Sequence, residues 1–93
     1  MSQAAYHEEF WADAPSDPEP WEWERRRAML LSAVRPGERV LDLGCGAGRF
    51  VAALREAGAE PIGVEIAQAA LDRAARNASG ADLRLVEPDG SLP

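Results

Sequence analysis

The chain has 93 residues, which is enough for one small domain and too few for two independent ones. Hydrophobic residues make up 46% of the chain and charged residues 28%, so most of it is expected to fold. Ten arginines and no lysine stand against sixteen acids, and the net charge of −6 argues against a surface for duplex DNA or anionic membranes.

Location is predicted from what the sequence contains. No apolar stretch approaches the roughly 20 residues that a membrane span needs. The first 24 residues hold no Lys or Arg, whereas a secretory signal begins with basic residues. Cys45 is the one cysteine and cannot form an internal disulfide. These features predict a cytoplasmic protein.

Residues 1–20 mix acids, prolines and aromatics without helical or strand periodicity, which predicts an irregular arm. Five of the six aromatic residues lie in the first 23 positions, too many for a purely solvated tail. The arm is therefore expected to pack on the domain formed by residues 21–93. It either covers an edge of that domain or closes over a ligand, and edge cover is the commoner use of such rings.

A helix is expected from Trp21 and ends at Pro36-Gly37. Short apolar runs then follow at 40–43, 61–65 and 83–86, about 21 residues apart. The segments between them place apolar residues at helical spacing and end on glycine. This alternation predicts a βαβαβ unit with parallel strands, an α/β fold that forms half of a Rossmann-like sheet.

The chemistry is concentrated in residues 40–50, VLDLGCGAGRF, where a strand runs into a glycine-rich turn and then a helix. Gly44, Gly46 and Gly48 let a ligand approach the backbone, and the helix N-terminus attracts a phosphate or a carboxylate. Glu65 ends the second strand, where nucleotide-binding sheets place an acid that accepts from both ribose hydroxyls. Together these features indicate an adenosine-containing ligand; the alternative is a tight turn with an exposed glutamate and no ligand.

The spacing separates two kinds of adenosine ligand. A dinucleotide site has the pattern GxGxxG, but Arg49 stands where its third glycine would be, and Gly48 comes one residue early. Asp42, two residues before the turn, would repel a pyrophosphate but suits a ligand that carries an ammonium and a sulfonium. S-adenosylmethionine is such a ligand, and an NAD-dependent oxidoreductase is disfavoured.

These motifs resemble those of the class I S-adenosylmethionine-dependent methyltransferases, especially the small type 11 branch. VLDLGCGAGRF is similar to the first motif of that family, GVEIA to its second-strand motif, and LRLVEPDGSLP to its third. The resemblance covers residues 35–93. It implies a Rossmann-like three-layer sandwich, of which this chain holds the βαβαβ half of a seven-stranded sheet after an N-terminal helix.

The resemblance also implies a cofactor site for S-adenosyl-L-methionine, whose product is S-adenosyl-L-homocysteine. Eight residues are expected to form it: Asp42, Gly44, Cys45, Gly46, Gly48, Glu65, Ile66 and Asp89. In the family pattern, the turn lines the methionine and ribose, Asp42 lies near the amino group, Glu65 holds the ribose hydroxyls and Ile66 packs on adenine. The acid that contacts adenine is either Asp89, which we favour, or Glu87, because neither stands at the usual spacing before Leu-Pro.

Other reactive side chains are expected to play no part in chemistry. Cys45 lacks a His-Asp pairing, so it is not expected to act as a nucleophile. His7 has no second ligand beside it, and the acids of the arm fit no calcium loop, so no metal site is expected. The catalytic residues are not identified by any motif.

The family's substrate pocket and general base come from strands beyond the third, so the chain is expected to be a fragment of a longer methyltransferase, with a small-molecule methyl acceptor favoured. The first strand would then have an unpaired edge, which a second copy, a partner chain or the arm could cover. The alternative function is a non-catalytic binding or assembly module that keeps the nucleotide fold.

Overall fold

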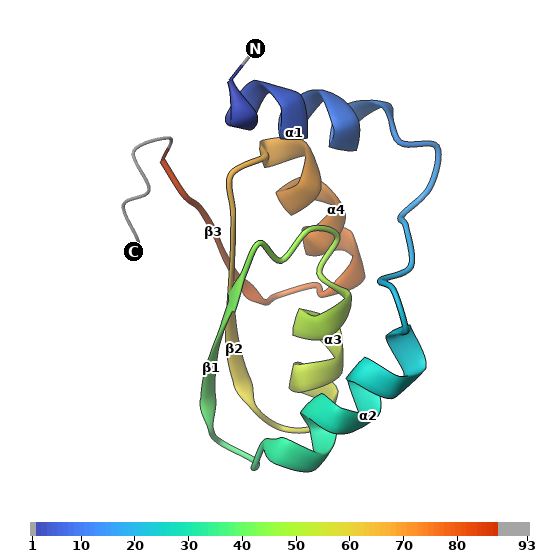
Figure 1. Cartoon of the computed structure of the whole chain (residues 1–93). Helices are drawn as coiled ribbons and strands as arrows, with labels where there is room; N and C mark the ends of the chain where they lie inside the picture. Colours follow the sequence, from blue (N-terminus) through green and yellow to red (C-terminus); the bar gives the residue numbers. More distant parts are fainter. Residues whose placement is uncertain (1, 88–93) are drawn as a thin grey trace.

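Seven elements follow one another along residues 2–87, the part of the chain that the computed structural model describes (Figure 1). They are α1 (Gln3–Asp13), α2 (Trp23–Ala33), β1 (Arg39–Leu43), α3 (Arg49–Glu56), β2 (Glu60–Glu65), α4 (Gln68–Asn77) and β3 (Asp82–Leu85). The predicted βαβαβ alternation is confirmed. Each strand begins and ends within one residue of the apolar run that predicted it. Both crossover helices lie inside the segments between those runs.

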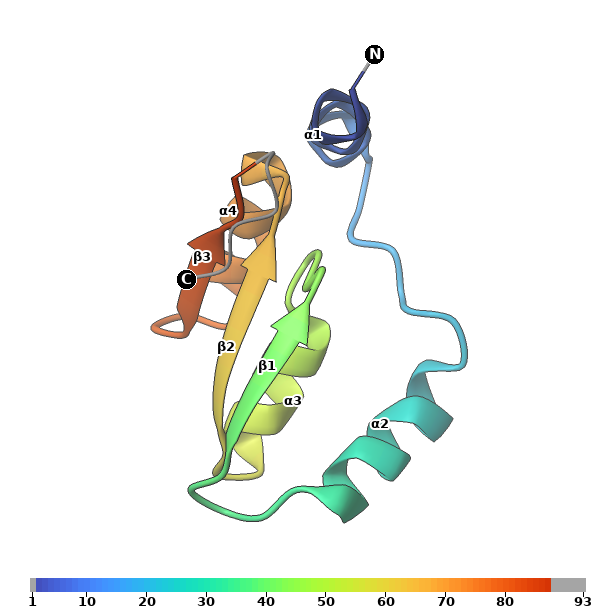
Figure 2. The same ribbon diagram turned by 60° about the vertical axis from the view of Figure 1, so that its left-hand side comes forward.

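The three strands form one parallel sheet in the order β1-β2-β3. Asp42 is in register with Gly63 and Leu43 with Val64, so the carboxyl ends of β1 and β2 lie together. Helices α3 and α4 both cover the same face of the sheet (Figure 2). This arrangement confirms the partial Rossmann-like fold and supplies two of its layers within residues 2–87.

The core lies between this face of the sheet and the two helices. Val51 and Leu54 of α3 are fully buried there. A Cβ at Gly63 would meet side-chain atoms of Val51, Cys45 and Leu83, each at 3.0 Å. Gly63 therefore lets α3 approach β2 closely, which brings the glycine-rich turn against the sheet.

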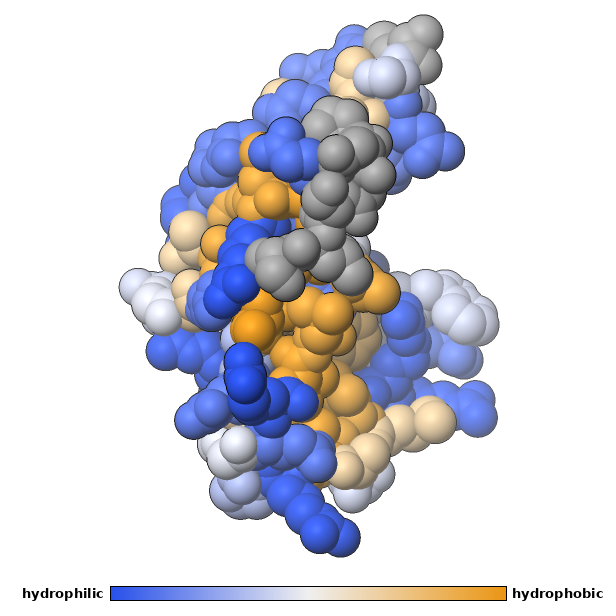
Figure 3. Space-filling model, turned by 90° about the vertical axis from the view of Figure 1, so that its left-hand side faces the viewer, coloured by the Kyte–Doolittle hydropathy of each residue, from blue (hydrophilic) through white to orange (hydrophobic). Residues whose placement is uncertain are grey.

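The opposite face of the sheet is apolar and open to solvent. Leu41 is 48% exposed and Leu43 is 64% exposed. Figure 3 shows a continuous apolar surface on this side of the molecule. Within the described residues, β1 is an edge strand, so this apolar face adjoins an unpaired edge.

The expectation of an irregular arm over residues 1–20 is wrong for residues 3–13, which form α1. Ser2 caps this helix by accepting a hydrogen bond from the Ala5 amide at 3.0 Å. No residue of α1 is buried. A helix that buries one face shows an apolar stripe in its sequence, and α1 has no such stripe from which it could be predicted. Residues 14–20 are irregular, as expected.

Helix α2 begins at Trp23, two residues later than expected, and contains no buried residue. Its predicted apolar stripe is only partly covered, since Met29 is 62% exposed. The helix is held to α3 by the tilted ring pair of Trp23 and Phe50, whose centroids lie 4.9 Å apart. None of the helices in the described part of the chain is long and apolar enough to cross a membrane.

Candidate functional site

The glycine-rich turn connects the end of β1 to α3. The amides of Gly44 and Cys45 both donate to the carbonyl oxygen of Val64, at 2.9 and 3.0 Å, which ties the turn to β2. Gly48 adopts a φ of 80°, and a Cβ there would come within 2.8 Å of the Ala74 Cβ. Glycine is required at this position because the turn packs directly on α4.

Glu65 lies at the end of β2 beside the turn and is only 7% exposed. Its Oε1 accepts from the Gly46 amide at 3.1 Å, and its Oε2 accepts from the amides of Ile66 at 2.8 Å and Ala67 at 3.1 Å. The carboxylate therefore joins the turn to the loop that leads into α4. These bonds use three of the roughly four acceptor positions of a carboxylate, so one remains for a ligand hydroxyl.

Asp42 precedes the turn and faces the same side of the sheet as Gly63. Its Oδ2 is buried and has no hydrogen-bond partner among the described residues. Burial raises the pKa of this carboxyl, the charge of Glu65 raises it further, and Arg26 opposes the shift. A buried oxygen without a donor is costly, which indicates a place for a donor group of a ligand.

Cys45 lies inside the turn but is directed into the core. Burial, followed by the charges of Asp42 and Glu65, raises the pKa of its thiol to about 12. The thiol is therefore protonated at neutral pH, and a protonated thiol is a poor nucleophile. Its position against Gly63 gives it a packing role.

Two adjoining cavities open above the turn, and we call them together the turn groove. One, of about 590 Å³, is lined by Glu65 and Ile66 from the end of β2 and by aromatic residues of α1. The other, of about 330 Å³, is lined by Asp42 and Arg49. Gly44, Gly46, Leu43 and Trp11 line both cavities.

The turn groove brings together most of the residues expected to bind a cofactor. Six of the eight line it: Asp42, Gly44, Cys45, Gly46, Glu65 and Ile66. Gly48 lies behind the turn against α4 and lines neither cavity. Asp89 lies outside the described residues, and Glu87 is exposed after β3.

Helix α1 contributes residues to the groove that were not predicted from the sequence. Tyr6, His7, Phe10 and Trp11 line the larger cavity opposite the ends of the strands. In the sequence they are marked only by the concentration of aromatic residues near the N-terminus. Which residues they contact could not be predicted, because α1 itself was not predicted. The structure places α1 beyond the carboxyl ends of the strands, where it contacts α4 (Figure 2).

The charge of the groove restricts its ligand. Asp42, Glu65 and Glu19 contribute three carboxyl groups and Arg26 and Arg49 two guanidinium groups, and the guanidinium of Arg49 lies 3.9 Å from the carboxylate of Glu19. Such a groove disfavours a pyrophosphate and favours a cationic group. Within residues 2–87, no group of three or more His, Cys, Asp or Glu side chains could hold a metal ion.

The fold and the groove define a Rossmann-like nucleotide-binding unit with an acidic pocket at its first turn. The family described as Methyltransferase domain matches residues 40–91, from β1 through the third motif. This chain belongs to that family. The resemblance identified from the sequence is thereby confirmed.

Curated relatives match over most of this chain but little of their own length. A 23S rRNA (uracil(1939)-C(5))-methyltransferase RlmD from Alkalilimnicola ehrlichii is 42% identical over 73 residues, which cover 68% of this chain and 16% of the relative. The RlmD of Aromatoleum aromaticum is 45% identical over 53 residues, 57% of this chain and 12% of the relative. The chain thus spans about a sixth or less of these relatives.

Solved structures share the fold at low sequence identity. A TehB-like SAM-dependent methyltransferase from Corynebacterium glutamicum superimposes with a TM-score of 0.64 at 19% identity, over 89% of this chain and 46% of that one. A SAM-dependent methyltransferase from Geobacter sulfurreducens, solved in complex with S-adenosyl-L-homocysteine, gives a TM-score of 0.59 at 21% identity, over 94% of this chain and 36% of that one.

Proposed function

We propose that this chain binds S-adenosyl-L-methionine in the turn groove and forms the cofactor-binding part of a methyltransferase. The observation that carries the proposal is the buried Oδ2 of Asp42 beside the glycine-rich turn, which has no donor among residues 2–87. The ammonium group of the cofactor is such a donor. The named complex of the Geobacter sulfurreducens relative with S-adenosyl-L-homocysteine supports the same ligand class.

The residues of the groove would hold the cofactor from one end to the other. Asp42 is proposed to receive its amino group, Glu65 one ribose hydroxyl through the remaining acceptor position, and Ile66 its adenine ring. When bound, S-adenosyl-L-methionine supplies a methyl group on a positively charged sulfur, and transfer leaves S-adenosyl-L-homocysteine. The described residues would orient this methyl group and surround it with acidic side chains. An adenine contact from Asp89 or Glu87 stays a prediction.

Calorimetric titration with S-adenosyl-L-homocysteine, with NAD as competitor, tests the proposal. We expect S-adenosyl-L-homocysteine to bind and NAD to leave the isotherm unchanged, because two carboxyl groups oppose a pyrophosphate. An amide NMR spectrum recorded in parallel should show the Gly44 and Gly46 signals moving. Absence of binding, or displacement by NAD, contradicts the proposal. If the protein binds S-adenosyl-L-homocysteine but transfers no methyl group, the non-catalytic module is favoured instead.

The methyl acceptor is proposed from the curated relatives. Their name specifies a uracil in 23S rRNA, so an RNA base is the acceptor class that we propose in place of the small molecule favoured from the sequence. The net charge of −6 means that few phosphate contacts would come from this part of the protein. The protein can be offered total RNA and a small-molecule extract with radiolabelled cofactor. Label in the low-mass fraction alone would restore the small-molecule acceptor.

The apolar face of the sheet supports the predicted covering of the β1 edge. Exposed Leu41 and Leu43 would be buried by a second copy of the chain or by a partner chain. Light scattering over a concentration series distinguishes a dimer from a monomer. A cytoplasmic location, predicted from the single cysteine, stays a prediction.

A further inference from the structure

The indole ring of Trp11 lies directly on the glycine-rich turn. A Cβ at Gly46 would sit 3.0 Å from Cζ2 and 3.2 Å from Cη2 of this ring. Trp11 also lines both cavities of the turn groove, with Glu65 on one side and Asp42 on the other. A ligand that reaches from Asp42 to Glu65 must therefore pass the indole ring.

The arm that carries Trp11 is fastened to α4 at two points. In the middle of α1, both carboxylate oxygens of Glu8 accept from the amide of Ala69, at 3.1 and 3.2 Å. Beyond the end of α1, Oδ1 of Asp17 accepts from Arg73 at 3.0 Å. In the sequence, Trp11 lies between these two contacts, so both restrict the position of its ring.

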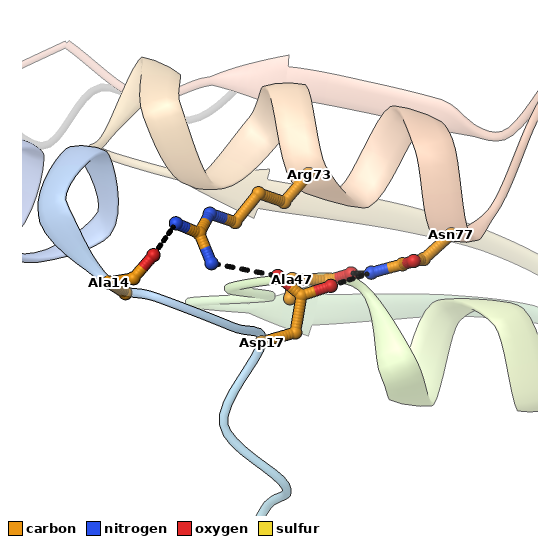
Figure 4. Close-up of polar contacts among 5 residues, drawn as sticks. All are labelled: Ala14, Asp17, Ala47, Arg73 and Asn77. Carbon is orange, nitrogen blue, oxygen red and sulfur yellow. Dashed lines mark hydrogen bonds and ion pairs between the residues drawn. The ribbon is translucent and has the colours of Figure 1, made fainter.

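Asp17 is joined to the glycine-rich turn as well as to α4 (Figure 4). Nδ2 of Asn77 donates to Oδ2 of Asp17 at 2.7 Å and to the carbonyl oxygen of Ala47 at 2.9 Å. Arg73 donates in addition to the carbonyl oxygen of Ala14, which is the C-cap of α1. One carboxylate thus connects the end of α1, the exposed side of α4 and the turn.

Arg73 links this network to the indole ring. Its guanidinium carbon lies 5.9 Å from the centroid of the Trp11 ring, within the range of a cation-π interaction. The Arg73 side chain is 12% exposed and the Asp17 side chain 30%, so the ion pair is partly shielded from water. The Asn77 hydrogen bond, followed by Arg73, holds the pKa of Asp17 below its usual value, so Asp17 is ionised at neutral pH.

We propose that Trp11 contacts the bound cofactor and that Asp17, acting through Arg73 and Asn77, is the positioning residue that holds Trp11 over the turn. This inference rests on the proposed binding of S-adenosyl-L-methionine in the turn groove. The arm then takes part in ligand binding, and α4 supports the side of the turn groove that Trp11 forms. An indole ring suits the task because its large flat face packs against the apolar atoms that S-adenosyl-L-methionine and S-adenosyl-L-homocysteine share.

Tryptophan fluorescence tests the contact, with S-adenosyl-L-homocysteine as the probe and calorimetry as an independent measure of binding. Saturating ligand should change the emission of the wild-type chain and of Trp21→Phe, whose indole is 78% exposed and lines neither cavity. Trp11→Phe should lose most of this change while still binding. A Trp11→Phe variant that keeps the full fluorescence change overturns the contact.

Substitutions of the network test the positioning role. Asp17→Ala and Asn77→Ala should each weaken binding about tenfold and shift the ligand-free Trp11 emission toward that of an exposed indole. The double variant should lose little more than either single one, because both remove the same connection. Asp17→Asn, which keeps one acceptor oxygen, should lose less. Asp13→Ala, an exposed acid at the end of α1, serves as the matched control.

The outcomes separate this inference from the function on which it rests. If the wild-type chain binds S-adenosyl-L-homocysteine and the Asp17 and Asn77 variants bind it equally well, the positioning role is wrong and the proposed function stands. If circular dichroism shows that Asp17→Ala does not fold, Asp17→Asn and Asn77→Ala decide the point. A wild-type chain that does not bind overturns both proposals.

Discussion

The carboxylate of Glu65 accepts a hydrogen bond from the amide of Gly46, 19 residues earlier in the chain, at 3.1 Å. The end of the second strand is thereby joined to the middle of the glycine-rich turn. The same carboxylate also binds the first two amides of the loop that follows it. A residue singled out for ligand recognition therefore also holds the shape of the site.

Glu65→Ala should lower both the stability of the chain and its affinity for the cofactor. Removing the acceptor of three amide hydrogen bonds is expected to cost about 3 kcal/mol in the free energy of unfolding. Binding of S-adenosyl-L-homocysteine should weaken at least about tenfold, or about 1.4 kcal/mol. Urea unfolding and calorimetry measure the two effects. Unchanged affinity would refute the ribose role, and unchanged stability would refute the structural one.

Asp42→Asn should have opposite effects on stability and on binding. The folded state holds this carboxyl with a raised pKa, because of burial first and then the charge of Glu65, against the weaker pull of Arg26. Folding therefore favours the protonated form, and the carboxyl reduces stability progressively as the pH rises above its unfolded value of 3.8.

The asparagine variant lacks this penalty, so its stability relative to wild type should increase as the pH rises from 3.5 to 7. Its affinity for S-adenosyl-L-homocysteine should fall about tenfold, because the ammonium group loses an ionic partner. Thermal unfolding at several pH values and calorimetry at neutral pH supply the comparison. A stability difference that stays constant with pH would show that Asp42 does not titrate as described.

The sequence was sufficient to predict the strands and the crossover helices because their burial imposes a regular apolar pattern. The two crossover helices each bury residues at helical spacing, such as Val51 and Leu54, and end near glycine. By contrast, α1 buries no residue and is held by polar contacts with α4, such as that between Glu8 and the Ala69 amide. Such contacts join residues about 60 positions apart and leave no local pattern.

The same distinction applies to the site. Asp42 and Glu65 stand at strand ends, where topology alone brings them together. The contact of Trp11 with Gly46 depends on the position of the arm, and that position depends on Asp17 and Asn77. No local pattern in the sequence connects these residues or shows that Gly48 packs behind the turn.

Gly48→Ala should destabilise the chain more than an alanine at a comparable glycine. Gly48 has a φ of 80° and its added Cβ would lie 2.8 Å from the Ala74 Cβ, so both backbone strain and a clash are expected. Gly37 has a φ of 82° with no atom within 4 Å of the added Cβ, so it reports the strain alone. We expect losses of about 3 and about 1 kcal/mol, respectively, in urea unfolding. Equal losses would show that α4 moves away freely.

Cys45 should react slowly with thiol reagents in the folded chain. Burial raises the pKa of its thiol to about 12, so only a very small fraction is ionised at pH 8. Modification by a disulfide reagent should therefore be at least about a hundredfold slower than in denaturant. Absorbance of the released thiolate follows the reaction. Rapid modification of the native chain would mean that the turn opens and exposes the thiol.

Leu41→Lys should reduce self-association without unfolding the chain. The side chain is 48% exposed on the open face of the sheet, in the edge strand β1, and lines neither cavity of the turn groove. The free energy of unfolding should change by about 1 kcal/mol or less. A positive charge on this face opposes contact between apolar surfaces of two molecules. Light scattering should therefore show a lower average mass for the variant at high concentration. A wild-type chain that is already monomeric at these concentrations would contradict covering by a second copy.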